Sequence, residues 1–354
     1  MKIGYLVQTL DRKTGGGRFA ADIIEEVKRL GHEVVVLKEG NQEGDGIEVL
    51  GRGLQIVTSI FKVRNLLKDV DVIHAIDGYP FGISAWFANM TLKKRLIISA
   101  LGTYAVAPLY RFPTSFFLKR AYLSAHRVVA ISNYTKNEIL KKITLNNICV
   151  VTPGINLMST IPKKLDESHK KFIIGVGGRK ERKGYHISLE AFAQIRNEFP
   201  DLNYVIVGDE DAAYQTWLDA IIEKYKIHDR VIFKHKITDE ELFSLYAQAE
   251  LFILTPIQTE ENHFEGFGLV YLEAAGAGLP VIGTSRSGAE DAINEGVNGY
   301  LVLPGSVEKA TQALRSILSS PETQALMKKN SIEWVNQHSI AREVQELCVV
   351  YNFK

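Results

Sequence analysis

The 354-residue sequence has little of what defines several protein classes. It holds two cysteines, Cys149 and Cys348, which lie far apart and lack the spacing of metal ligands, so we expect neither a disulfide framework nor a cysteine metal site. With 42 basic and 41 acidic residues it has no excess charge that would indicate a dedicated nucleic-acid binder. No apolar run approaches the length of a membrane span, and the first is too short for a signal peptide. We therefore expect a cytoplasmic protein.

The remaining composition is that of a globular protein, with 46% hydrophobic and 23% charged residues. A chain of this length can build two domains of ordinary size, each with its own core.

The most informative stretch is Thr255–Gly283, T-P-I-Q-T-E-E-N-H-F-E-G-F-G-L-V-Y-L-E-A-A-G-A-G-L-P-V-I-G. Glu265 and Glu273 are separated by seven positions, and the glycine-rich segment 266–268 directly follows the first of them. The run Leu269–Ala277 is predicted to be a helix, which a glycine and a proline then terminate.

A glycine-rich loop that leads into a helix leaves backbone N–H groups unpaired at the positive end of the helix dipole, which suits phosphate. Glu265 would lie on this loop and Glu273 one to two turns inside the helix, so the two carboxylates would reach different parts of one long ligand. A nucleotide sugar, with a diphosphate between two hydroxyl-bearing groups, fits this arrangement. Either glutamate alone would be read as an ordinary solvated residue.

A second informative loop, G-V-G-G-R-K-E-R-K-G, ends at Gly184. Arg179 and Lys183 follow a buried strand and precede a helix, so both can point to the helix N-terminus. Fixed cations there would stabilise the charge that grows on a departing diphosphate. We expect Lys180 and Arg182 to be solvated, and we expect no metal ion to be needed.

Strand Lys2–Val7, loop Thr14–Arg18 and helix Phe19–Leu30 open a doubly wound α/β domain. The three glycines of this loop do not fit the dinucleotide fingerprint, and a tight turn is the plainer interpretation. The second half of the chain repeats the alternation of strand and helix, which predicts a second parallel sheet.

Three other features have plain interpretations. The D-V-D at 69–71 precedes a strand, so it is read as a solvated loop and not as a metal site. His74 lies in an apolar strand and is expected to be a core histidine. Segments Gly53–Lys68 and Tyr104–Arg127 mix aromatics with basic residues, which fits either an interfacial, acceptor-facing surface or helices that pack their aromatics inward.

The stretch Thr255–Gly283 resembles the E-x7-E signature of retaining glycosyltransferases of family four, and T-P-G-I-N at 152–156 is similar to the turn that closes their first domain. The resemblance implies the GT-B fold, two Rossmann-like doubly wound α/β domains facing across a cleft. The expected domains are 1–160, on the acceptor side, and 161–337, which binds the nucleotide sugar, with a polar linker at 157–171. A C-terminal helix at about 338–354 would pack back onto the first domain.

The same resemblance implies the function: metal-independent transfer of a sugar, with retained configuration and no cofactor, from a UDP- or GDP-sugar to a glycan or lipid-linked acceptor. Peripheral contact with the cytoplasmic face of a membrane is left open. The implied catalytic residues are Glu265, Lys183 and Arg179, and the implied nucleotide-sugar-binding residues are Gly16, Gly17, Gly266, Phe267, Gly268, Leu269, Glu273, Lys236 and Ile237.

The chain departs from the family pattern at two places. The interval from Arg179 to Lys183 is about one residue shorter than the commoner form. Leu101 stands where the family has a histidine that reaches the donor sugar, and an unpaired buried hydroxyl costs about 1–3 kcal/mol. We therefore infer a donor with no hydroxyl there, such as a 6-deoxy sugar or a pentose; the alternatives are that another residue takes the place of the histidine or that catalysis is impaired. Two alternative functions stay open, a nucleotide-sugar epimerase of the same fold and a non-catalytic nucleotide-sugar binder.

Overall fold

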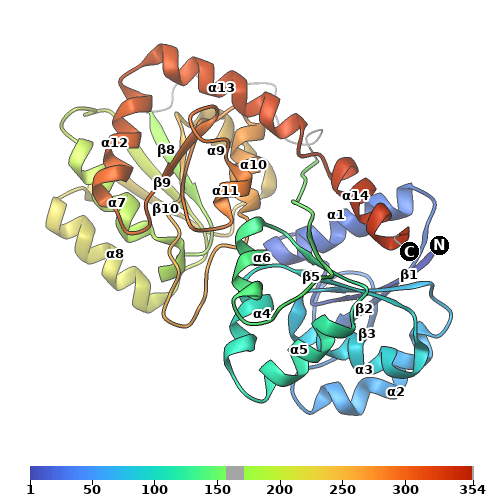
Figure 1. Cartoon of the computed structure of the whole chain (residues 1–354). Helices are drawn as coiled ribbons and strands as arrows, with labels where there is room; N and C mark the ends of the chain where they lie inside the picture. Colours follow the sequence, from blue (N-terminus) through green and yellow to red (C-terminus); the bar gives the residue numbers. More distant parts are fainter. Residues whose placement is uncertain (157–170, 353–354) are drawn as a thin grey trace. The chain divides into compact units, whose positions relative to one another are not determined.

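A computed structural model of the chain describes residues 1–156 and 171–352 (Figure 1). The chain divides into two compact units, the first formed by Met1–Gly154 with Ser339–Lys354 and the second by Ile155–His338. The boundary expected at 160 and 161, and nearly all of the expected linker, lie outside the described residues.

The first unit contains one seven-stranded parallel sheet in the order β3-β2-β1-β4-β5-β6-β7. Its strands are β1 (Lys2–Val7), β2 (Glu33–Glu39), β3 (Ile47–Leu50), β4 (Val72–Ile76), β5 (Arg95–Ala100), β6 (Arg127–Ala130) and β7 (Ile148–Val150). Its α-helices are α1 (Gly15–Arg29), α2 (Gln55–Leu67), α3 (Ile83–Leu92), α4 (Thr103–Val106), α5 (Thr114–Ser124), α6 (Asn133–Leu140) and α14 (Ile340–Asn352). The order reverses between β1 and β4, as the doubly wound prediction requires.

The glycine triplet was wrongly predicted as a loop, because helix α1 begins at Gly15. The Thr14 side chain caps the helix by accepting a hydrogen bond from the Gly17 N–H at 3.1 Å. A Cβ atom on Gly17 would lie 2.1 Å from the backbone oxygen of Asp11, so this glycine is required by the close approach of the preceding turn. Gly16 has no such neighbour within 4 Å.

His74 is a core residue, as predicted, and it helps to attach the C-terminal helix. Its side chain is fully buried in β4, with one ring nitrogen 2.8 Å from the Ser99 hydroxyl and the other 2.8 Å from the Tyr351 hydroxyl. Tyr351 belongs to α14, and its hydroxyl also lies 3.0 Å from that of Tyr5 in β1. Burial lowers the pKa of His74 to about 3, so the ring is neutral at physiological pH. Helix α14 thus packs in the first unit, where it contacts α1 (Figure 1).

The second unit contains one six-stranded parallel sheet in the order β10-β9-β8-β11-β12-β13. Its strands are β8 (Phe172–Val176), β9 (Asn203–Val207), β10 (Val231–Lys234), β11 (Phe252–Ile253), β12 (Val281–Thr284) and β13 (Gly299–Val302). Its α-helices are α7 (Tyr185–Ile195), α8 (Ala212–Tyr225), α9 (Asp239–Gln248), α10 (Leu269–Gly276), α11 (Ala289–Ala292), α12 (Val307–Leu318) and α13 (Pro321–Asn336). Every residue of β8, β9 and β12 is buried, which explains their continuous apolar sequences. The prediction of two Rossmann-like domains is confirmed.

The start of α1 provides a matched pair of substitutions. Gly17→Ala should lower the free energy of unfolding by about 2 kcal/mol, because the added methyl group overlaps the Asp11 carbonyl. Gly16→Ala should instead raise it by about 0.5–1 kcal/mol, since alanine favours a helix over glycine and the position is open. Urea denaturation of both variants measures the difference, and equal effects would contradict this account of the turn.

Candidate functional site

Most of the predicted site residues of the second unit lie on loops that follow the carboxyl ends of its parallel strands, and Leu269 and Glu273 lie in the helix that follows one of these loops. The loop 177–184 follows β8, the loop 254–268 follows β11, and the turn 285–288 follows β12. The strand order reverses between β8 and β11, and ligands of open α/β sheets bind at such a switch point.

Two of these loops are joined by close backbone contacts. The Ile257 N–H donates to the Arg182 carbonyl at 2.9 Å, and the Thr255 hydroxyl donates to the Gly184 carbonyl at 2.7 Å. Gly184 has a φ of +67°, and a Cβ atom there would lie 1.7 Å from the Thr255 oxygen. Glycine is therefore required at this position, and the contact fixes the backbone on either side of Lys183.

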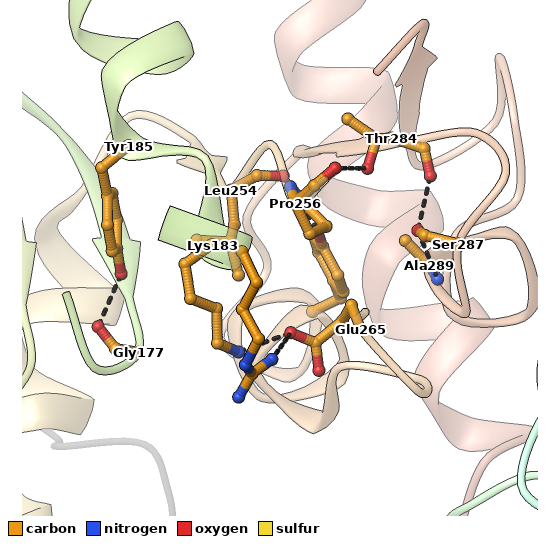
Figure 2. A network of polar contacts seen from close by, with 11 residues as sticks. Gly177, Lys183, Tyr185, Leu254, Pro256, Glu265, Thr284, Ser287 and Ala289 are labelled. Carbon is orange, nitrogen blue, oxygen red and sulfur yellow. Dashed lines mark hydrogen bonds and ion pairs between the residues drawn. The ribbon is translucent and has the colours of Figure 1, made fainter. Parts of the chain in front are cut away.

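Glu265 and Lys183, two predicted catalytic residues, point toward each other in Figure 2 and form an ion pair of 2.5 Å. Each side chain is only 11% exposed. The same Glu265 oxygen also accepts a hydrogen bond from Arg182 at 3.3 Å. Two cations of the loop 177–184 therefore contact one carboxylate of the loop 254–268.

Burial and charge act in opposition on this cluster. Burial alone would raise the pKa of Glu265, but Lys183 and Arg182 outweigh it, and the pKa lies below its ordinary value. Burial lowers the pKa of Lys183 more than Glu265 raises it. Lys183 and Glu265 are both ionised at neutral pH, because a 2.5 Å contact between them stabilises both charged forms.

The segment from Gly266 to Leu269 leads from this cluster into α10. Gly268 has a φ of +87° at the N-cap, and a Cβ atom there would lie 2.6 Å from the Tyr271 ring. Among the described residues no side chain caps this helix, so no side-chain oxygen accepts from its first amides. The Gly288 N–H, in the turn after β12, donates to the Glu265 carbonyl at 2.9 Å.

Hydrogen bonds hold the turn after β12 against the loop after β11 (Figure 2). The Thr284 hydroxyl donates to the Pro256 carbonyl at 2.7 Å, and the Ser287 hydroxyl donates to the Thr284 carbonyl at 2.8 Å. Ser287 in turn accepts from the Ala289 N–H at 3.2 Å. Because these groups are paired within the protein, they support the loop that carries Glu265.

Glu273 is half-buried in α10, the helix that begins at Leu269. It accepts a hydrogen bond from the Tyr246 hydroxyl at 3.3 Å. Tyr246 belongs to α9, so the carboxylate lies between two helices of the second unit. This partner differs from those of Glu265, which are Lys183 and Arg182.

Arg179 is 1% exposed, and its surroundings differ from those of Lys183. Its Nη2 donates to Glu210 at 3.1 Å, and its guanidinium carbon lies 4.8 Å from the centre of the Phe233 ring. Its Nε and Nη1 atoms are buried without a partner among the described residues. Unpaired buried donors are rare in folded proteins and indicate a ligand or water.

The remaining predicted binding residues belong to other segments of the chain. Lys236 is exposed with a φ of 53°, and Ile237 is half-buried, both between β10 and α9. Gly16 and Gly17 belong to the first turn of α1 in the first unit.

The expectation that Arg182 is solvated was wrong, since it is the second cation on Glu265. Lys180, in contrast, is exposed as predicted. Residues 181–183 form a single 3-10 turn. The pairing of Arg182 depends on Glu265, 83 positions away in the chain, which the local sequence does not report.

Within the described residues no group of three His, Cys, Asp or Glu side chains could hold a metal ion. Asp71 of the D-V-D accepts a hydrogen bond from the Lys2 N–H at 2.8 Å. In the described part of the chain, no helix is long and apolar enough to cross a membrane.

Comparison with known proteins gives consistent matches to one class of enzyme. Residues 158–334 match the model of the glycosyl transferases group 1 family, and residues 13–158 match the model of glycosyltransferase family 4. The chain is 24% identical over 281 residues to the GDP-mannose-dependent alpha-(1-6)-phosphatidylinositol monomannoside mannosyltransferase of Mycolicibacterium smegmatis, covering 75% of this chain and 72% of that one.

Solved structures match over nearly the whole chain. Anabaena Alr3699/HepE in complex with UDP-glucose superposes with a TM-score of 0.83 at 20% identity, covering 99% of both chains. Sucrose-phosphate synthase from Thermosynechococcus elongatus superposes with a TM-score of 0.82 at 18% identity, covering 99% of this chain and 98% of that one.

The fold and these matches define a glycosyltransferase enzyme of the GT-B class. The chain belongs to the glycosyl transferases group 1 family, whose model spans half of its length.

The buried ion pair can be tested by a double-mutant cycle on stability. Glu265→Gln and Lys183→Met should each cost roughly 3 kcal/mol, because each leaves the partner charge buried. The double variant should cost at least about 1 kcal/mol less than the sum. The exposed pair Lys224–Glu190, at 3.4 Å, is the matched control and should couple by less than about 1 kcal/mol. Additive losses at Lys183 and Glu265 would show that the pair is not coupled.

Proposed function

We propose that the protein is a retaining glycosyltransferase that moves a sugar from a UDP- or GDP-sugar to a glycan or lipid-linked acceptor without a metal ion. The observation that carries this proposal is the buried Lys183–Glu265 pair, with the half-buried Arg182 beside it, just before the uncapped start of α10. Cations beside unpaired helix amides form a site for a diphosphate, and the carboxylate next to them suits sugar hydroxyls.

The parts of the donor can be assigned to the parts of this site. The diphosphate would bind Lys183 and the amides of Phe267, Gly268 and Leu269, beyond the turn at Gly266, and Gly16 and Gly17 remain proposed binding residues of the first unit. Glu273 would accept hydrogen bonds from the ribose hydroxyls, and the base would lie near Lys236 and Ile237.

Two arginines are proposed to act with Lys183. Arg182 already contacts Glu265, so a bound diphosphate would give it and Lys183 a second anion. Arg179 would use its unpaired Nε and Nη1 atoms to donate to donor oxygens. Together they supply positive charge where a metal ion would otherwise act.

The proposed reaction follows from this placement. The acceptor hydroxyl oxygen attacks the anomeric carbon on the face from which the diphosphate departs, so the configuration is retained. The bond from this carbon to the diphosphate oxygen breaks, and that phosphate takes the proton of the acceptor hydroxyl. Lys183 and the arginines stabilise the negative charge that grows on the leaving group, a charge larger in the transition state than in the bound donor. Glu265 would orient the transferred sugar.

The names of similar proteins support both donor classes. The mycobacterial relative is named for GDP-mannose and a phosphatidylinositol acceptor, and the Anabaena structure holds UDP-glucose. Membership in a transferase family does not favour an epimerase or a non-catalytic binder. The two free cysteines fit the proposed cytoplasmic location, where nucleotide sugars are available.

The proposal is tested first by thermal shift with UDP, GDP, ADP and their sugars, because binding to the folded state raises the melting temperature. The sugar nucleotide that gives the largest shift is then used in a transfer assay. Lys183→Ala and Glu265→Gln should lower kcat/KM by about 10²-fold or more, and Arg182→Ala by about tenfold. Lys180→Ala is the control, because this neighbouring cation is exposed, and should change it by less than about twofold. Near-normal turnover in the first two variants would show that the site is misplaced.

Leu101, the residue directly after β5, tests the nature of the donor sugar. If the donor carries no hydroxyl for a side chain here, Leu101→His should improve kcat/KM for a 6-hydroxylated hexose relative to a 6-deoxy sugar or pentose by about tenfold. Kinetics with paired donors on the same nucleotide measure this ratio. An unchanged donor preference would remove the argument for a deoxy sugar or pentose.

A further inference from the structure

The turn after β4 places one acidic side chain where the carboxyl ends of the first sheet meet. Asp77 directly follows β4, and the strand order reverses between β1 and β4, so this turn lies at the switch point of the first unit. The Asp77 residue is 8% exposed. It belongs to none of the loops that carry the proposed donor site of the second unit.

The backbone of Asp77 has a conformation that suits glycine. Its φ is +114° and its ψ is +154°, a region that residues with a Cβ atom rarely adopt. Glycine occupies the next position, Gly78, where a Cβ atom would lie 2.3 Å from the Tyr122 hydroxyl. Crowding therefore explains Gly78, whereas the conformation at position 77 would by itself favour glycine there as well. Strained residues of this kind occur at sites where the side chain is needed.

The carboxylate of Asp77 is also unfavourable in this place. Burial raises its pKa to about 7, although the N–H groups of Gly78 and Leu101 and the charge of Arg52 favour the ionised form. Its Oδ1 accepts a hydrogen bond from the Gly78 N–H at 2.7 Å. A neutral side chain such as asparagine could accept the same bond without burying a charge, so the turn alone does not require a carboxylate.

The charged and titratable groups that face Asp77 come from two neighbouring segments. Arg52, between β3 and α2, acts on the carboxylate through its charge, and its Nε and Nη2 atoms donate to Glu39 at 2.6 and 3.1 Å. Tyr122 of α5 is buried, and its hydroxyl donates to the Ala105 carbonyl at 2.9 Å. An ionised carboxylate has about four acceptor positions, more than the neighbouring backbone N–H groups can fill. Asp77 can therefore accept further hydrogen bonds from a ligand.

We propose that Asp77 is an acceptor-binding residue, whose carboxylate accepts hydrogen bonds from the hydroxyl groups of a sugar acceptor on the first unit. Hydrogen bonds to a charged acceptor are about twice as strong as those between neutral groups. A phosphate or carboxylate ligand is disfavoured, because like charges repel. Asp77 positions the acceptor, and the proton of the attacking hydroxyl still passes to the departing phosphate. This inference rests on the proposed function and narrows its acceptor to a sugar that is bound through its hydroxyls.

The test compares Asp77→Asn with Asp71→Asn, which change the two acids that flank β4. Asp71 precedes the strand, is exposed, and also accepts a hydrogen bond from a backbone N–H, that of Lys2 at 2.8 Å. The probes are the octyl glycosides of glucose, galactose and mannose, with the sugar nucleotide found by thermal shift as the donor. At a pH of about 8, Asp77→Asn should lower kcat/KM for the acceptor that the wild type uses best by about tenfold or more. Asp71→Asn should change it by less than about twofold.

The pH profile separates acceptor binding from a role in the turn alone. In the wild type, kcat/KM for the acceptor should rise with pH up to about 7, the pKa of Asp77, and Asp77→Asn should remove this limb. Asp77→Gly suits the backbone conformation, so it should keep the fold and still lose acceptor kcat/KM by about tenfold.

Melting temperatures check the ionisation of Asp77 without an activity assay. The folded state binds this proton more tightly than the unfolded state, because the pKa is raised from 3.8 to about 7. The stability that the group contributes below pH 3.8 is therefore lost as the pH rises through about 7. The wild type should lose stability relative to Asp77→Asn over this range, and a constant difference would contradict the ionisation.

Donor-induced thermal shifts, and hydrolysis of the donor by water in the absence of acceptor, should be the same in all variants. Normal acceptor kcat/KM in Asp77→Asn or Asp77→Gly, an equal loss in Asp71→Asn, or a pH limb that persists in Asp77→Asn would each overturn the proposal. So would a wild type that binds and hydrolyses the donor but transfers sugar to none of the three glycosides. These results would leave the proposed donor site intact, whereas a wild type that binds no sugar nucleotide would overturn the proposed function itself.

Discussion

The interaction on which the candidate site depends is the buried ion pair between Lys183 and Glu265. Two charges with little exposure are stable only if they face each other closely and keep their other hydrogen bonds. The backbone contacts of Gly184 with Thr255, and of Gly288 with Glu265, hold both loops in the positions that this requires. The same charges would be a poor choice for stability alone, since apolar residues could fill that space at lower cost. We infer that function retains them.

The position of the pair follows from topology. β8 and β11 are neighbours in the sheet although β9 and β10 come between them in the chain. At such a reversal of the strand order, the loops after the two strands lead to helices on opposite faces of the sheet, which leaves room for a ligand at the strand ends. The rest of the donor-site proposal extends from there: α10 presents its amides on one side, and Arg179 lies toward β9 and β10 through Glu210 and Phe233.

Much of the fold could be predicted because hydrophobic periodicity and glycines report local structure directly. Strand β1 has the predicted bounds, and α10 ends within one residue of its prediction, where Gly278 takes a positive φ. Strand β3 was not anticipated, because a short edge strand after a polar, glycine-rich turn leaves little apolar signal. The start of α1 was placed too late, since three glycines favour a loop until the Thr14 cap is seen.

The sequence by itself determined the class of fold, the helix that follows the glycine-rich loop, and the types of side chain at the site, because these depend on local pattern and composition. Only the tertiary structure decided which arginine joins Lys183 at Glu265, that Arg179 keeps two donors unpaired, and which aromatics of α2 and α5 face solvent. The reason is physical: pairing and exposure depend on residues far away in the chain, which the strand order brings together and which no local pattern encodes.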